Sequence, residues 1–220
     1  PADWSSGQFQ DVETAAVGDG ALALVEGVPR GVFTSAPITA PFPYTALGAL
    51  WLARTPQQSW VGLDIRHSDD GQVWSAWQAT WPSDDLGGRG NLRIADSLFG
   101  LGRIVQYRLQ LERGGGASPI VESVQLVFID SSTGPTAAQL ALERAQAGPS
   151  SSPVIPRQAW GAQTSPVVWQ PEYRPMRALV IHHSGAEANG ADPAAMVRAL
   201  HYYQAIVLER GDIGYQYLID

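Results

Sequence analysis

The chain has 220 residues, of which 45% are hydrophobic and 16% charged, with a net charge of -7 and no cysteine. This apolar content is enough for a packed core, which excludes a disordered chain, and the acidic balance excludes a general nucleic-acid binder, because such proteins need a basic face. Without cysteine the chain has no disulfides, thiolate ligands or thiol nucleophiles, and no apolar run approaches the ~18 residues that a membrane-spanning helix needs.

Residues 1–130 are predicted to form an all-β sandwich of the jelly-roll type. Short segments rich in Val, Ile, Tyr, Phe and Trp alternate with turn residues, as in antiparallel sheets. Within residues 106–113 the alternation is strict, since Tyr107, Leu109 and Leu111 lie on one side and polar residues on the other, which predicts a half-buried strand. The strands are expected at 31–40, 45–54, 60–68, 73–81, 103–112 and 120–130.

The rest of the chain is predicted to be a linker followed by a second domain. Residues 131–153 have Gly, Pro and Ser at both ends, which is typical of an interdomain linker, and a helix is expected within them at 136–147. Residues 154–220 are predicted to form an α/β domain. The apolar run over 176–181 predicts a buried strand.

A helix is predicted after Asp192 and Pro193, because aspartate caps free N–H groups and proline fits the first turn. Gly211 is expected to end this helix through a left-handed cap. A further strand is predicted over 213–219, and the order strand, helix, strand implies a parallel or mixed sheet. The helix presents one apolar stripe, made of Met196, Leu200, Tyr203 and Val207.

Histidine residues are the first candidates for chemistry. His182 and His183 follow the predicted strand where it meets a loop at Ser184, and active sites of open α/β sheets gather at such strand ends. Adjacent strand residues point to opposite faces, so only one imidazole of the pair can face a given metal. From spacing alone, the pair is more simply explained as two polar residues that close a strand. His201 is expected to be a surface or interface residue and not a ligand.

Three motifs then occur in order within residues 154–220: RQAWGA at 157–162, LVIHHSG at 179–185 and DIGYQYLID at 212–220. Together they resemble the N-terminal part of the peptidoglycan-recognition and type-2 N-acetylmuramoyl-L-alanine amidase family. The resemblance covers less than half of that family's domain. It implies an incomplete α/β amidase-like domain with a mixed sheet.

This resemblance also implies roles for individual residues. His182 corresponds to a zinc ligand, and Tyr215 to a catalytic phenol that hydrogen-bonds the zinc-bound water or the developing oxyanion. His183 and Ser184 are expected to line the substrate groove. The family's other zinc ligands, a His and a Cys or Asp, would lie beyond residue 220, so this chain alone is expected to be inactive. Without the resemblance, Tyr215 is more simply a sheet aromatic with a surface hydroxyl.

Residues 65–77 resemble the Ser-x-Asp-Gly hairpin of discoidin-like, galactose-binding-like sandwiches. Asp70 and Gly71 predict a tight turn there, because glycine accepts the positive φ that such turns need. The resemblance implies a carbohydrate- or wall-associated module in which Trp74 and Trp77 stack on sugar rings. The alternative is that such large aromatic side chains fill the core. About three members of the set Trp51, Trp60, Trp74, Trp77 and Trp81 are expected in the core.

Two functions from different classes follow. The first is a fragment of a secreted or cell-envelope peptidoglycan hydrolase, a zinc-dependent amidase that cleaves the lactyl–L-Ala amide, preceded by a glycan-binding module. The second is a non-catalytic peptidoglycan-binding or self-assembling surface protein. In the second case the unpaired C-terminal strand would invite strand addition and form a homo-oligomer. The expected partner in both is peptidoglycan or another cell-surface glycan.

Overall fold

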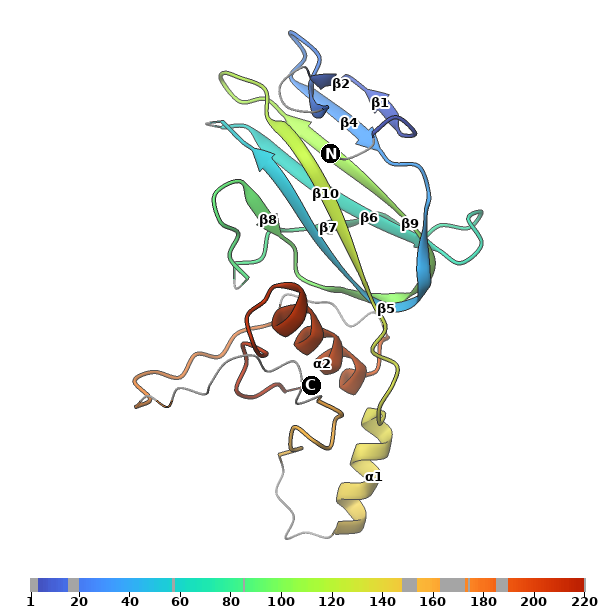
Figure 1. The fold of residues 1–220 in the computed structure, drawn as a ribbon, viewed down its shortest axis with the longest axis vertical. Helices are drawn as coiled ribbons and strands as arrows, with labels where there is room; N and C mark the ends of the chain where they lie inside the picture. The colour runs from blue at the N-terminus through green and yellow to red at the C-terminus, as the bar shows by residue number, and fades with distance from the viewer. Residues whose placement is uncertain are drawn as a thin grey trace. The chain divides into compact units, whose positions relative to one another are not determined.

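The computed structural model of the chain divides into two compact units (Figure 1). Unit 1 comprises Pro1–Pro43, Gly48–Asp96 and Gly102–Val127, and unit 2 comprises Tyr44–Leu47, Ser97–Leu101 and Phe128–Asp220. The structure describes residues 4–15, 20–56, 58–84, 86–147, 154–162, 173, 175–184 and 190–219. None of the helices in these ranges has both the length and the apolar character needed to cross a membrane.

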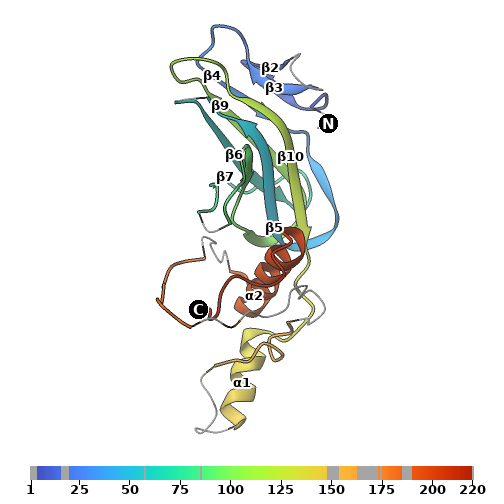
Figure 2. The same cartoon turned by 60° about the vertical axis from the view of Figure 1, so that its left-hand side comes forward.

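The described strands form one sheet, and seven of its strand pairs are antiparallel. They are β1 (Gln8–Gln10), β2 (Val12–Ala15), β3 (Ala21–Leu24), β4 (Arg30–Thr34), β5 (Ile38–Arg54), β6 (Trp60–Ser68), β7 (Gln78–Thr80), β8 (Leu92–Ile94), β9 (Leu98–Glu112) and β10 (Ile120–Ile129). Their order is β1-β4-β9-β5-β10-β3-β2, with β6 on β9, β7 on β6 and β8 on β5. Figure 2 shows the long strands β5 and β10 side by side. This confirms the prediction of a mostly β, antiparallel first part.

The register between β6 and β9 sets the two faces of the sheet in unit 1. Leu63 pairs with Leu109 and Ile65 pairs with Tyr107, and all four side chains are buried. Paired residues share a face and successive residues alternate, so Leu111 is buried on this same face. The predicted half-buried strand is therefore confirmed. Burial also raises the pKa of Tyr107 to about 12.

Phe33 of β4 is the centre of an aromatic cluster on this buried face. Its ring centroid lies 5.2 Å from that of Trp4, 5.1 Å from that of Phe9 and 6.1 Å from that of Tyr107. The first two contacts are edge-to-face, a geometry that adds about 0.5–1.5 kcal/mol beyond area burial. The cluster joins the segment before β1 to the strands β1, β4 and β9.

The predicted Asp-Gly turn follows β6 but belongs to a longer connection. The hydroxyl of Ser68 accepts hydrogen bonds from the amides of Asp70 and Gly71, and Gly71 has a φ of +75°. The Asp70 carboxylate accepts from the amides of Gln72 and Val73. These bonds satisfy the turn backbone locally, so the chain does not return to the sheet until β7. The strand predicted over 73–81 is therefore shorter than expected.

Unit 2 contains two helices whose first turns share one carboxylate. Helix α1 is Ala137–Ala147, as predicted, and helix α2 is Pro193–Tyr202. One oxygen of Asp192 accepts from the amide of Ala195 at 3.0 Å, and the other accepts from the amide of Ala137 at 2.7 Å. A negative charge at a helix N-terminus is favourable because the free N–H groups point at it. Asp192 thus caps α2 as predicted and also stabilises the start of α1.

Helix α2 continues into a π-helical turn, η1 (Tyr203–Val207). Leu200 and Tyr203 of the predicted apolar stripe are buried. The predicted cap at Gly211 comes too late, because the helical backbone ends before it and Glu209 already has a positive φ of 53°. Gly211 itself has a φ of +79° and lies in the bend that follows.

The strands predicted over 176–181 and 213–219 are wrong, since neither segment has regular secondary structure. Leu179, Val180 and Ile181 are 77%, 75% and 84% exposed. An apolar run forms a strand only beside a partner strand, and the described residues of unit 2 offer no such partner here. The mixed α/β sheet is therefore not formed in the described residues. The edge on which the expected self-association depended is not formed either.

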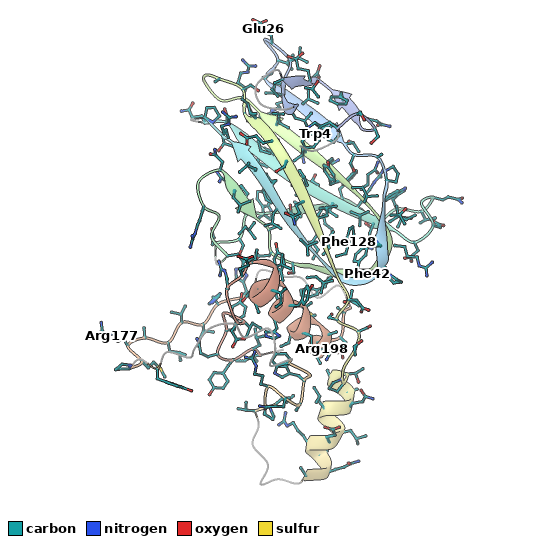
Figure 3. The ribbon with its side chains drawn as sticks, in the orientation of Figure 1. Trp4, Glu26, Phe42, Phe128, Arg177 and Arg198 are labelled. Carbon is teal, nitrogen blue, oxygen red and sulfur yellow. The ribbon has the colours of Figure 1, made fainter. Side chains whose placement is uncertain are left out.

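A buried arginine joins α2 to two other segments of unit 2. Nε of Arg198 donates to the carbonyl oxygen of Ser131 at 2.9 Å, and Nη1 donates to those of Pro135 and Trp160 at 2.9 and 3.0 Å (Figure 3). Arg198 is only 8% exposed. Gly134 has a φ of +139°, and a Cβ there would lie 2.9 Å from the guanidinium carbon. Only glycine therefore lets this segment approach Arg198 so closely.

We expect Arg198→Ala to destabilise unit 2 by about 2–4 kcal/mol, because it leaves buried carbonyl oxygens without donors and opens a cavity. The change would be measured by hydrogen exchange of the α2 amides and of residues 131–135. Arg144→Ala, on the exposed side of α1, is the matched control and should change little. Equal exchange rates in the two variants would contradict this role for Arg198.

Candidate functional site

The outer side of β6 and β9 in unit 1 carries an ordered set of polar side chains. Asp64 pairs with Arg108, and Arg66 pairs with Gln106, between the buried pairs of the same two strands. Gln110 follows on β9. Alternation places all of these side chains on the face opposite the core. We call this surface the polar face, and define it by Asp64, Arg66, Gln106, Arg108 and Gln110 together with Trp74 and Trp77.

Hydrogen bonds fix most of these side chains in place. Nε of Arg108 donates to Oδ2 of Asp64 at 2.6 Å, and Nε2 of Gln110 donates to the same oxygen at 2.7 Å. Nε and Nη2 of Arg66 both donate to Oε1 of Gln106, the first at 2.8 Å. The Asp64 side chain is 7% exposed and that of Arg108 is 33% exposed. Side chains ordered in this way lose little further entropy when they bind a ligand.

Two tryptophan rings stack with the arginines of the polar face. The guanidinium carbon of Arg66 lies 4.6 Å from the ring centroid of Trp74 and 4.5 Å from that of Trp77. The guanidinium carbon of Arg108 lies 4.7 Å from the Trp77 ring. Each such cation–π contact contributes about 0.5–2 kcal/mol, depending on solvent exposure. The connection between β6 and β7 is thereby fixed over the polar face, and both rings remain half-buried.

The expectation that about three sandwich tryptophans lie in the core is wrong. Trp51 is 1% exposed, whereas Trp60 and Trp81 are 40% and 65% exposed. Trp60 precedes Gly62 on the outer side of β6, and a Cβ on Gly62 would overlap the Trp60 ring. The ring therefore lies over the glycine at the surface. Trp60 and Trp81 are exposed and Trp74 and Trp77 are half-buried, because these residues lie outside the buried alternation of the sheet.

In unit 2, the structure brings together two of the residues predicted for the amidase site. The ring centroids of His182 and Tyr215 lie 5.7 Å apart, with the planes inclined by 46°. Nδ1 of His182 is 2.9 Å from the carbonyl oxygen of His183. His182 and His183 are exposed and Ser184 is half-buried. These residues lie in an irregular segment and not at the end of a buried strand.

The predicted zinc site can be tested against the available ligands. A catalytic zinc takes about three protein ligands, normally His nitrogen, Cys sulfur or carboxylate oxygen. Within the part of the chain that the structure describes, no group of three or more His, Cys, Asp or Glu residues could hold a metal ion. The described residues therefore offer His182 as a single ligand and do not make a complete zinc centre.

Sequence reasoning missed a cluster of half-buried charged side chains around His201, which is itself 4% exposed and not a surface residue. Nη2 of Arg157 lies 2.9 Å from Nε2 of His201, and the two Nη atoms of Arg157 donate to the Asp212 carboxylate at 2.8 and 2.6 Å. Nε2 of His201 is 3.4 Å from Asp212 Oδ1, and Trp160 packs edge-on against the imidazole at 5.9 Å. The signal lay in the RQAWGA and DIGY motifs, which supply three of these residues.

The charges of this cluster shift two pKa values. Burial lowers the pKa of His201 most, the Arg157 charge lowers it further, and the Asp212 carboxylate raises it without offsetting the other two. Burial opposes the ionisation of Asp212 most strongly. The hydrogen bonds from Arg157 and from the Ile213 amide, with the charges of Arg157 and His201, outweigh it, so the net pKa lies below its usual value. We conclude that Arg157 and Asp212 form an ion pair against a neutral His201.

No family model matches the chain, and no curated protein matches it. Among solved structures, tailspike protein 4 of bacteriophage CBA120 aligns with 58% of this chain at 11% identity and a TM-score of 0.36, and the chain covers 20% of its length. TmCBM61 bound to β-1,4-galactotriose aligns with 57% of this chain, at 12% identity, a TM-score of 0.34 and 90% coverage of its own length. Chitosan-binding module 1 of the Paenibacillus sp. IK-5 chitosanase/glucanase aligns with 55% of this chain at 13% identity and a TM-score of 0.33, and the chain covers 92% of its length.

The His201 environment predicts a pH dependence for unit 2. The folded pKa lies below the ordinary value of 6.5, so the unfolded chain binds the proton more readily. This contribution to the free energy of unfolding is therefore fully present above pH 6.5 and decreases as pH falls below it. Urea titrations followed by the α2 amide signals in NMR would measure it. His201→Gln should remove this pH dependence, and an unchanged pH profile in that variant would contradict the assignment.

Proposed function

We propose that unit 1 is a carbohydrate-binding module of the β-sandwich, jelly-roll type, which binds a cell-surface glycan through the polar face. In this proposal the protein works outside the cell or in the cell envelope, with peptidoglycan as the first candidate ligand. The observation that carries the proposal is the stacking of Trp74 and Trp77 with Arg66 and Arg108 on the side of the sheet opposite the core.

The chemistry of sugars fits such a surface. A pyranose ring has an apolar face of C–H groups and a rim of hydroxyl groups, so it suits an indole ring beside planar hydrogen-bonding side chains. Gln110 and Arg108 supply an amide and a guanidinium group whose positions are already fixed. Trp60 and Trp81, which are exposed on the same side of the sheet by alternation from β6 and β7, could extend the surface.

The test is depletion of the protein from solution by insoluble peptidoglycan, with titration of soluble glycan strands followed by calorimetry. We expect Trp77→Ala and Trp74→Ala to weaken binding by about tenfold or more, because each removes a ring from the centre of the site. Phe9→Ala is the matched control. Phe9 is 41% exposed. It pairs with Phe33, which pairs with Leu109 on the buried face of the sheet, so Phe9 lies on the side opposite the polar face.

Thermal denaturation of each variant would separate loss of binding from loss of folding. Two results contradict the proposal: the wild-type chain binds none of these glycans, or a folded Trp77→Ala variant binds as tightly as Phe9→Ala.

A second proposal is favoured by the approach of His182 and Tyr215 to 5.7 Å between their rings. In this proposal unit 2 is the opening part of a zinc-dependent N-acetylmuramoyl-L-alanine amidase, with further ligands beyond residue 220. His182 is one metal ligand, and the Tyr215 hydroxyl donates to the oxygen that becomes negative when the lactyl–L-Ala amide is attacked. His183 and Ser184 contact the substrate.

This proposal is tested on the protein isolated from its native source. We expect a mass above that of the 220-residue chain and about one zinc per chain. His182→Ala should lose zinc and wall hydrolysis. Tyr215→Phe should keep zinc and lose about 10²- to 10³-fold in rate, as when one oxyanion donor is removed. Tyr217→Phe, at a tyrosine that is 74% exposed, is the control. A native protein without zinc would overturn the proposal.

A further inference from the structure

Arg66 differs from the other arginine of the polar face in its partners. Arg108 pairs with the Asp64 carboxylate at 2.6 Å. Arg66 donates instead to the neutral Gln106 side chain, and it has no ion pair among the described residues. The polar face therefore carries one guanidinium charge in excess, although the whole chain has a net charge of -7. An uncompensated cation at a half-buried position has lost part of its hydration, which a bound anion would replace.

The geometry around Arg66 leaves donors for such an anion. Nε and one N–H of Nη2 are used by Gln106, whereas Nη1 makes no hydrogen bond among the described residues. The rings of Trp74 and Trp77 lie above the guanidinium carbon at 4.6 and 4.5 Å, so they restrict where the group can move. A guanidinium is planar and its N–H donors lie in that plane, a geometry that matches a carboxylate better than a hydroxyl.

We propose that the polar face recognises a carboxylated sugar, whose carboxylate accepts hydrogen bonds from Arg66 while its ring lies against Trp74 or Trp77. This inference rests on the proposed glycan binding of unit 1 and specifies the chemical class of the glycan. The shared chemistry is a carboxylate attached to a pyranose. It could come from a uronic acid within a polysaccharide or from the lactyl group of a muramyl sugar that carries no stem peptide, since the lactyl–L-Ala amide removes that charge.

Two matched pairs of soluble probes separate these sources. Trigalacturonate is compared with α-1,4-linked galactotriose, and the disaccharide N-acetylglucosaminyl-N-acetylmuramic acid is compared with N,N′-diacetylchitobiose. Each pair differs mainly by the carboxylate. Calorimetry on the whole chain should show about tenfold tighter binding of the carboxylated member in at least one pair, as expected for a charge-assisted hydrogen bond. That preference should decrease with added NaCl, whereas binding of the neutral member should not.

Variants at Arg66 then assign the preference to this side chain. Arg66→Gln should bring the ratio of the two affinities within a pair close to one. Loss of the Arg66 contacts with Trp74 and Trp77 should lower both affinities in common, so the ratio is the readout. Arg66→Lys should restore part of the preference, because it keeps the charge but not the planar fork. Arg54→Gln is the matched control, since it removes the same charge from an arginine that pairs with Glu122 on another part of the sheet. Indole signals of Trp74 and Trp77 in NMR spectra would show whether the face stays ordered.

The possible outcomes separate the carboxylate preference from the proposed glycan binding of unit 1. If both members of each pair bind equally, and Trp77→Ala abolishes both, glycan binding stands and the carboxylate inference is overturned. If Arg54→Gln lowers the preference as much as Arg66→Gln does, the effect is general charge and the inference is also overturned. If the wild-type chain binds no probe and no peptidoglycan, the proposed function and the inference both fail.

Discussion

The pairing of β6 with β9 is the constraint on which unit 1 depends. Nine consecutive residues of β6 pair with β9, and from Leu63–Leu109 to Arg66–Gln106 apolar pairs alternate with polar pairs. A slip of β6 by one residue would move Asp64 and Arg66 into the core and Leu63 to the solvent. Burying such charges costs several kcal/mol per ion, so this register is strongly specified. The same constraint that buries the core therefore also builds the polar face.

The segments of unit 2 are held together by polar contacts to a greater extent than the strands of unit 1. Asp192 accepts hydrogen bonds from the first turns of both helices, and Arg198 donates to carbonyl oxygens of two other segments. These groups lie six positions apart, at the start of α2 and in its middle. Hydrogen bonds are directional, so they position the segment between β10 and α1 against α2 more specifically than apolar contacts alone. Arg157 and Asp212 join the last described segment to α2 in the same way, around the neutral His201.

Local patterns predicted the elements of this fold where one segment carries its own signal. The strict alternation around Leu109 and the cap at Asp192 are of this kind, and the structure confirms both. The apolar run over 176–181 carried no such signal, because its strand needed a partner that sequence alone cannot supply. His201 was misplaced for a similar reason. Its burial depends on Arg157 and Trp160, which precede it by about forty residues and carry no periodicity that points to the helix.

In the candidate sites, too, some residues carry a local sequence signal and others are recognised only through distant partners. Trp74 and Trp77 could be named from a hairpin motif, but their partners Arg66 and Arg108 follow only from the strand register. His182 and Tyr215 could be named from a family resemblance, and the structure brings their rings together, with no complete set of metal ligands among the residues it describes.

Glycan binding and metal-assisted hydrolysis require different arrangements of side chains. A binding face needs aromatic rings and donors at fixed separations, and unit 1 has them on one paired ladder of strands. Metal-assisted hydrolysis needs about three ligands, a polarised carbonyl and excluded water at one point. His182 is an exposed residue of an irregular segment, which supplies one ligand and does not exclude water. The glycan recognition proposed for unit 1 therefore uses only described residues, whereas the hydrolysis proposed for unit 2 would require groups in addition to them.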